Sequence, residues 1–253
     1  MRFFPLILIF LALNACTVKK YTGTTSQPVS HKMWDKLLKE HVNDEGWVDY
    51  QGFIKDSAQL NGYLDLLSRN HPNDANWSRE EQLAYWINAY NAFTIKLVAD
   101  HYPVESIKDI KKGIPFVNTV WDIKFIRIEG ATYDLNNIEH GIIRPTFKDY
   151  RVHFALNCAS RSCPKLLNEA YTAEKLDRQL DDAARTFLAD PEKNKISENK
   201  VEVSRILDWY WGDFKDKFDS VPDFINAYSA VKVSKKAEVS YLEYDWGLNE
   251  VRN

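Results

Sequence analysis

The sequence has few cysteines, no second long apolar run, no internal repeat and no excess of basic residues. Beyond residues 3–13, no stretch approaches the ~20 apolar residues that cross a bilayer as a helix, so no transmembrane helix is predicted there. No Pro-, Gly- or Ser-rich break divides the chain, and 45% of its residues are hydrophobic. These features predict one globular domain with a sizeable core over residues 31–253. The net charge of −3 gives no indication of nucleic-acid binding.

The amino terminus has the features of a lipoprotein signal. Arg2 precedes the apolar run Phe3 to Leu13, which is about half the length of a membrane-spanning helix. The following segment, Leu13-Asn14-Ala15-Cys16, resembles the lipobox of bacterial lipoproteins. Residues 1–15 are therefore predicted to be a lipoprotein signal peptide, and Cys16 to be the lipidated first residue that binds the membrane. The alternative is an ordinary secretory peptide with an incidental cysteine.

Residues 16–30 are small, polar and aperiodic, which predicts a flexible tether between the lipid and the domain. Thr17 stands next to Cys16, at a position where an aspartate is associated with retention in the inner membrane. We therefore expect an outer-membrane lipoprotein that faces the periplasm.

The arrangement of periodic segments predicts an α+β fold, with several helices packed on a small, mostly antiparallel sheet. The clearest element is a central helix that opens at the capping box Ser78-Arg79-Glu80-Glu81 and ends before Pro103. Further helices are expected at 32–42, 58–69, 135–144, 173–189, 206–218 and 221–230. Strands are expected at 120–128, 132–133, 152–156 and 239–244, with a small hairpin around 198–199.

The segment RVHFALNCASRSCP, residues 151–164, contains the only two cysteines beyond Cys16. Val152 to Leu156 is predicted to be a buried strand that delivers Cys158 to the loop beyond its end. Cys158 and Cys163 allow a disulfide, since the periplasm oxidises thiols and five residue steps can bring them within bridging distance. A metal site formed by both cysteines with His140 and His153 fits no standard zinc spacing. No metal and no cofactor is therefore predicted.

The other interpretation makes Cys158 a nucleophile, because a thiolate near Arg161 and an imidazole has a lowered pKa. His140 is the preferred base, with Glu139 as the group that orients its ring, and His153 is second. Asn88 and Asn91 lie one helical step of three apart, and either bond the backbone of the cysteine loop or bind substrate. With Asn157 and Arg161 they complete the predicted binding residues.

Three motifs carry a family resemblance: Tyr85-Trp86-Ile87-Asn88-Ala89-Tyr90-Asn91-Ala92, Ile138-Glu139-His140-Gly141-Ile142-Ile143-Arg144, and His153-Phe154-Ala155-Leu156-Asn157-Cys158 followed by Ser162-Cys163-Pro164. With them the chain resembles the family called domain of unknown function 547, over about residues 75–190. The resemblance supplies a family name and a site but no settled activity. Similar domains in eukaryotes are fused to leucine-zipper or glutaredoxin-like modules.

Two functions remain open at this point. The first is a cysteine-dependent hydrolase or acyltransferase that acts on a small-molecule, peptide-like or cell-wall substrate. The second is a non-enzymatic binding or scaffold lipoprotein, whose loop is locked by a Cys158–Cys163 disulfide. Trp209, Tyr210, Trp211 and Trp246 either stack on a ligand or build the core. The sequence gives no indication of the oligomeric state.

Overall fold

The computed structural model describes residues 21–112 and 118–251, and its fold belongs to the α+β class. The predicted signal peptide and Cys16 lie outside the described residues. None of the helices within the described ranges has the length and apolarity to span a membrane.

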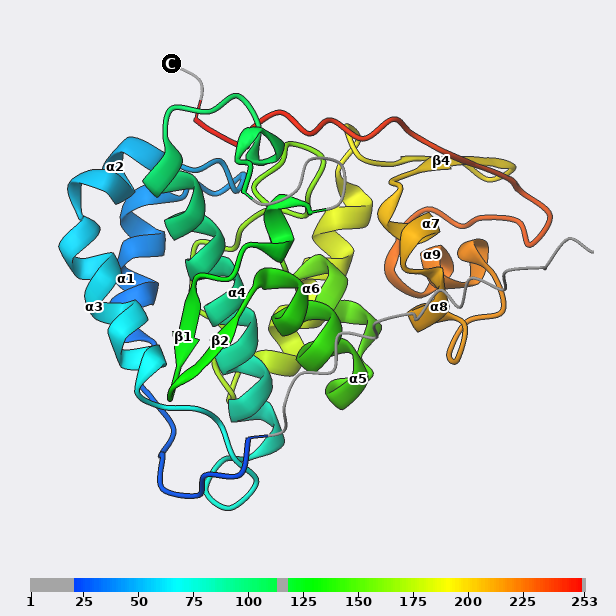
Figure 1. Ribbon diagram of the computed structural model, residues 1–253. Helices are drawn as coiled ribbons and strands as arrows, with labels where there is room; N and C mark the ends of the chain where they lie inside the picture. The colour runs from blue at the N-terminus through cyan, green and yellow to red at the C-terminus, as the bar shows by residue number, and fades with distance from the viewer. Residues whose placement is uncertain (1–20, 113–117, 252–253) are drawn as a thin grey trace, which may run out of the picture.

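Four helices form the larger half of the fold, on the left of Figure 1. They are α1 (Lys32–His41), α2 (Tyr50–Lys55), α3 (Ser57–Ser68) and α4 (Arg79–His101). The capping box predicted for α4 is present: the Ser78 hydroxyl accepts from the amide of Glu81, and the Glu81 carboxylate accepts from the amide of Ser78. Because most residues between Leu83 and Val98 are buried, α4 is the core helix, as the sequence predicts.

A short hairpin packs against these helices and consists of β1 (Ile126–Ile128) and β2 (Ala131–Tyr133). The two turn residues, Glu129 and Gly130, have φ angles of 43° and 79°. Positive φ angles at both central residues are what a tight two-residue hairpin turn requires. The strand predicted at 120–128 is shorter than expected. Its first part forms the 3₁₀ turn η2 (Val120–Asp122), which follows the similar turn η1 (Ile107–Asp109).

The helix predicted at 135–144 is a π-helix, η3 (Asn137–Ile143), that continues into α5 (Arg144–Phe147). Pro145 does not end it, because a proline in the first turn of α5 has no hydrogen bond to lose. π-Helical turns occur frequently at functional sites, and this one contains Glu139 and His140.

The strand predicted at 152–156 is wrong. Residues Tyr150–Phe154 form the 3₁₀ helix η4, which Asp149 caps by accepting from the amide of Arg151. A short apolar run has the same composition whether it is a buried strand or a buried helical turn, so periodicity could not separate the two. His153 therefore lies on a helical turn.

The second half of the fold, on the right of Figure 1, contains short helices and a three-stranded sheet. The strands β3 (Lys195–Ile196), β4 (Lys200–Val203) and β5 (Glu238–Tyr241) lie in that order; the first pair is antiparallel and the second parallel. The helices are α6 (Leu176–Ala189), α7 (Ile206–Trp209), α8 (Trp211–Phe214) and α9 (Val221–Tyr228). The described sheets are therefore two, and not one.

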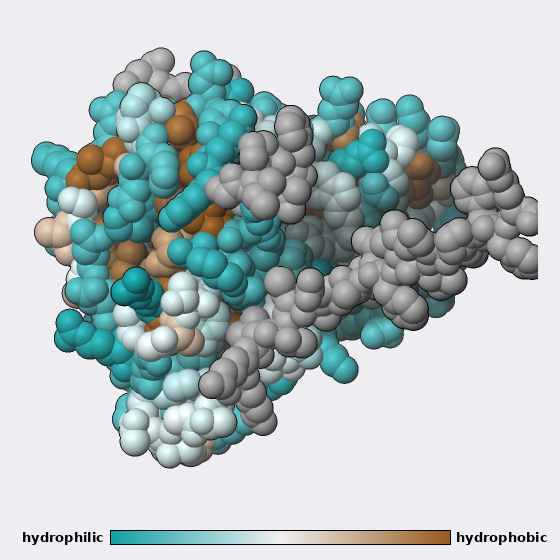
Figure 2. Space-filling model, in the orientation of Figure 1, coloured by the Kyte–Doolittle hydropathy of each residue, from teal (hydrophilic) through white to brown (hydrophobic). Residues whose placement is uncertain are grey.

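Each half has its own hydrophobic cluster: one surrounds α4, and the other surrounds Phe154, Phe214 and Phe224. Figure 2 shows the apolar residues of this face as separate patches among hydrophilic ones. After β5 the chain returns along the top of Figure 1 to the first half, where Leu248 bridges Ser160 and Glu250 bridges Val48. The cysteine loop is thus enclosed by the C-terminal segment.

Residues 21–30 contain no helix or strand, yet they contact the domain where the sequence predicts a flexible tether. Ser26 is buried, and its carbonyl accepts hydrogen bonds from the side chains of Asn73, Asn76 and Trp77 at 3.0 to 3.2 Å. These bonds hold the segment around Ser26 against the domain.

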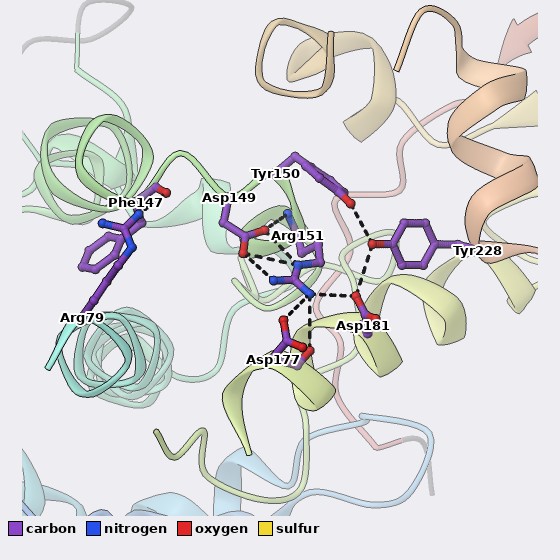
Figure 3. A network of polar contacts seen from close by, with 8 residues as sticks. All are labelled: Arg79, Phe147, Asp149, Tyr150, Arg151, Asp177, Asp181 and Tyr228. Carbon is purple, nitrogen blue, oxygen red and sulfur yellow. Dashed lines mark hydrogen bonds and ion pairs between the residues drawn. The ribbon is translucent and has the colours of Figure 1, made fainter. Parts of the chain in front are cut away.

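Arg151 joins η4 to α6 (Figure 3). Its guanidinium contacts Asp149 at 2.7 Å, and Asp177 and Asp181 at 2.8 Å each. The hydroxyl of Tyr228, on α9, donates to Asp181 and bonds that of Tyr150. The guanidinium presents five donors in a fixed, planar fork, which lets it bond three carboxylates at once.

We predict that Arg151→Gln lowers the free energy of unfolding by about 2 kcal/mol, because it removes charge-assisted bonds and leaves three carboxylates near one another. Arg151→Lys recovers only part of the loss, since an ammonium lacks the fork. Urea unfolding measures both. Arg178→Gln, at an exposed position of α6, is the matched control and changes stability by less than about 0.5 kcal/mol. An equal loss in both Gln variants would contradict the role of the network.

Candidate active site

The central helix determines where the cysteine loop lies. The side-chain amide of Asn91 donates to the carbonyl of Ala155 at 2.9 Å and accepts from the amide of Asn157 at 2.9 Å. The side chain of Asn157 in turn donates to the carbonyl of Pro164 at 2.7 Å and accepts from the amide of Ala159 at 2.9 Å. Ala159 has a φ of +61°, a strained value for a side chain larger than glycine, and it forms a sharp turn directly after Cys158.

Cys158 is surrounded by hydrogen-bonding groups. Its sulfur lies 3.3 Å from the hydroxyl oxygen of Ser160 and 3.4 Å from that of Tyr244. Hydrogen bonding with Cys163 is the main cause that lowers the pKa of the Cys158 thiol to about 7; the two hydroxyl groups add to it, and burial opposes it. The lowered pKa favours the thiolate form of Cys158, and no histidine is among its main causes.

Cys163 has the opposite character. It is buried, and burial together with the neighbouring Cys158 raises the pKa of its thiol well above the usual value. Its sulfur accepts from the amide of Cys158 at 2.8 Å. Both cysteines are free thiols in this structure, so the disulfide that the sequence allows is not formed in it.

Cys158 lies on the wall of a cavity of about 270 Å³, which we call the cysteine pocket. The lining combines the predicted site residues with a ring of aromatic side chains from both halves of the fold. The residues used below are Tyr90, Glu139, His140, His153, Cys158, Cys163, Trp209, Tyr210, Tyr244 and Trp246. The cavity is smaller than the ~300–1,000 Å³ of pockets for drug-sized ligands, so it suits a small ligand or the end of a longer one.

His153 is buried, and its Nε2 lies 2.8 Å from Oδ2 of Asp213. Because the carboxylate of Asp213 only accepts, Nε2 of His153 donates, and the neutral ring keeps its lone pair on Nδ1. Tyr210 stacks on the imidazole with ring centroids 3.9 Å apart. Burial lowers the pKa of His153 and outweighs the opposing effect of Asp213, so the ring is neutral at neutral pH.

His140 is bound differently, although the sequence analysis preferred it as the base. Its Nδ1 lies 2.9 Å from a guanidinium nitrogen of Arg144. Since arginine only donates, Nδ1 accepts, and the proton of the neutral ring lies on Nε2. Glu139, the predicted orienting group, is 3.7 Å from the same Nδ1, which is longer than a hydrogen bond. In this arrangement His140 is a donor and has no free lone pair.

The remaining predicted residues lie outside the cysteine pocket. Asn88 donates to the carbonyl of Tyr171 at 2.8 Å and accepts from its amide at 3.0 Å. Asn88, Asn91 and Asn157 are all buried, and their amides bond the backbone. Arg161 faces another surface, where its guanidinium lies 3.4 Å from Asp245.

Sequence reasoning missed several groups of the site, namely Ser160, Asp213 and Tyr244, and it left Tyr210 open between ligand stacking and core packing. Tyr244 lies in the C-terminal segment close to other aromatic residues, which was a signal for an aromatic cluster. Asp213 had none, because it is 60 positions from its partner His153.

A group of three metal-ligating side chains occurs elsewhere within the described residues, at Glu40, His41 and Asp56. His41 and Asp56 already form an ion pair at 2.8 Å. This group is separate from His140, His153, Cys158 and Cys163.

Comparison with known families agrees with the resemblance stated for the sequence. Residues 75–188, a little under half of the chain, match the model of the family described as "Protein of unknown function, DUF547". The match includes α4, η3, η4 and the cysteine loop, and thus much of the pocket wall. No curated protein and no solved structure matches the chain.

We predict that Asp213 makes stability depend on pH. Hydrogen bonds with His153 and with Arg144, at 2.6 and 2.9 Å to the guanidinium, overcome burial and hold the pKa of Asp213 far below its usual range. A lowered pKa contributes stability that is fully present above about pH 4, the unfolded value, and is lost as the pH falls toward the folded value.

Asp213→Asn should therefore lower the free energy of unfolding by roughly 1–2 kcal/mol at pH 7, a figure reduced for the partial exposure of the carboxylate. The difference from the native protein should narrow below about pH 4, as urea unfolding at pH 7 and pH 3 will show. Asp216→Asn, at an exposed position nearby, is the control. A difference that stays constant with pH would count against the assignment.

Proposed function

We propose that the protein is a cysteine-dependent hydrolase or acyltransferase, with Cys158 as its nucleophile. The observation that carries this proposal is a low-pKa thiol, held by Ser160 and Tyr244, on the wall of a small aromatic pocket. A thiol of ordinary structural function is buried in apolar surroundings and has a raised pKa, as Cys163 does. The contrast between the two cysteines favours a reactive role for one of them.

The proposed reaction has two steps. The thiolate of Cys158 attacks the carbonyl carbon of an acyl compound, a thioester forms, and the leaving group departs with the proton that the thiol has lost. Water then attacks the thioester, which releases a carboxylic acid and restores the thiol. An acceptor amine or alcohol in place of water gives acyl transfer.

His153 is the better base for the second step. Its Nε2 donates to Asp213, which leaves Nδ1 as an acceptor, and Nδ1 has no hydrogen-bond partner among the described residues. This is the logic of a catalytic triad, in which a carboxylate fixes the tautomer. No histidine contacts the Cys158 sulfur within the described part of the chain. We therefore infer that His153 takes a proton from the attacking water and not from the thiol.

Alkylation and acylation test the proposal. We predict that iodoacetamide labels Cys158 faster than Cys163, with a rate that rises around pH 7. Tyr244→Phe removes a hydrogen-bond donor to the Cys158 sulfur and should move that rise to higher pH.

With p-nitrophenyl acetate, the mass of the intact protein should show one acetyl group on Cys158. His153→Asn should slow its hydrolysis at least tenfold and leave labelling nearly unchanged, whereas His140→Asn should affect both little.

Equal, slow labelling of both cysteines would contradict the proposal that Cys158 is a nucleophile. The protein would then be better described as a binding or scaffold protein.

We also propose that the chain is an outer-membrane lipoprotein that faces the periplasm. The support is the short apolar run and the lipobox-like Leu13-Asn14-Ala15-Cys16. In the described part of this segment, Tyr21 donates to Glu129 and stacks on His71, and Thr24 and Ser26 accept from Asn76 and Asn73, so the chain is held against the domain from Tyr21 onward.

We predict that mass spectrometry finds a diacylated or triacylated Cys16 at the amino terminus of the mature chain. Cys16→Ser should move the protein from the membrane fraction to the soluble fraction, because one polar segment cannot replace the lipid chains. Ser26→Ala, which alters a buried hydroxyl but not the lipobox, is the control and should stay in the membrane. Retention of the Cys16→Ser variant in the membrane would exclude this anchor.

A further inference from the structure

Glu139 is a buried carboxylate that lines the cysteine pocket, with only 6% of its surface exposed. Among the described residues its one ionic neighbour is Nδ1 of His140 at 3.7 Å, and that nitrogen accepts from Arg144 and bears no proton. The hydroxyl of Tyr210 is the other polar group near it and donates a hydrogen bond to the carboxylate. After burial, the charge of Glu139 is the largest cause that raises the pKa of Tyr210.

The nearest strong cation, Arg144, interacts with the charge of Glu139 at a distance but forms no ion pair with it. Arg144 uses Nε and one terminal nitrogen on Asp213 and the other terminal nitrogen on His140. No lysine or arginine within the described ranges forms an ion pair with Glu139. A buried carboxylate without a cation is costly, unless a bound group supplies the charge.

Aromatic rings line the same pocket as this carboxylate. Trp209 and Trp246 stack with centroids 5.9 Å apart, and Tyr244 lies 4.8 and 4.6 Å from them. Trp209 is 47% exposed, an unusual amount for a side chain with so many ring neighbours. Ring faces attract cations through their quadrupole, and a cage of rings with one carboxylate is the arrangement that binds ammonium groups.

The rings of Tyr210 and Trp246 already carry cations, namely the guanidinium of Arg144 at 5.1 Å and the ammonium of Lys108 at 4.5 Å, whereas Trp209 has no such partner among the described residues. We propose that the cysteine pocket binds the ammonium group of a small ligand, with Glu139 as its counter-ion and the half-exposed ring of Trp209 beside it. This inference rests on the proposed function, since it makes the acyl compound that reaches Cys158 one that carries an amine. A neutral ligand that only stacks on the rings, such as a sugar, would have no use for a buried carboxylate.

Choline and its uncharged isostere 3,3-dimethylbutan-1-ol test the proposal on the full chain in detergent, by tryptophan fluorescence and calorimetry. The two probes have the same shape and differ in charge. We expect choline to bind at least tenfold more tightly. Glu139→Gln should reduce the affinity for choline about tenfold and leave that for the alcohol unchanged, whereas Trp209→Ala should weaken both.

Two controls keep the result interpretable. Glu198→Gln makes the same change at an exposed position between β3 and β4, and it should alter neither affinity. Glu139→Asp retains the charge and should retain most of the preference for choline, which separates a lost counter-ion from a damaged fold. Equal affinity for the two probes, or an unchanged preference in Glu139→Gln, would overturn the proposal.

The outcome is distinct from that of the acylation experiment. Acetylation of Cys158 without a preference for choline would overturn the ammonium site and leave the thiol chemistry. A Glu139-dependent preference for choline without acetylation would support the ammonium site and leave a receptor in place of an enzyme.

Discussion

The bonds between Asn91 and the backbone on each side of Leu156 fix the start of the loop that carries Cys158. A side-chain amide buried in a helix must satisfy both its oxygen and its nitrogen, and Asn91 does so with Asn157 and Ala155. Because α4 is buried nearly all round, it cannot shift to follow a moving loop. The start of the cysteine loop is thereby as rigid as the core, a requirement for aiming a thiol.

The pocket lies where the two hydrophobic clusters meet. Tyr90 and Leu156 come from the larger cluster, Ile206 and Tyr210 from the smaller. The pair formed by Arg144 on α5 and Asp213 on α8 joins the two sides beside it. A change in packing between the halves would therefore reach His153 through its bond to Asp213. Stability and pocket geometry are linked through the same carboxylate.

Local sequence patterns predicted much of the fold, whereas contacts between residues far apart in the sequence determine the geometry of the site. The α4 helix follows from its capping box and its apolar residues, and the turn Glu129-Gly130 from its own chemistry. The sequence also identified Cys158 as the centre of interest. It ranked His140 before His153 without knowledge of their partners Arg144 and Asp213, and Asp213 is 60 positions away from His153. Nor could it separate a buried strand from the 3₁₀ turn η4.

The chemistry of the pocket links binding to reactivity. Glu139 and the Cys158 thiolate are two negative charges that line one small cavity, and a negative charge nearby disfavours the ionised form of a thiol. A cation between them reverses this effect, because it interacts favourably with both. An ammonium ligand at Glu139 would therefore increase the thiolate fraction of Cys158 at the moment when an acyl group arrives. In the empty pocket the thiol would be less reactive, which would limit its alkylation and oxidation by unrelated compounds.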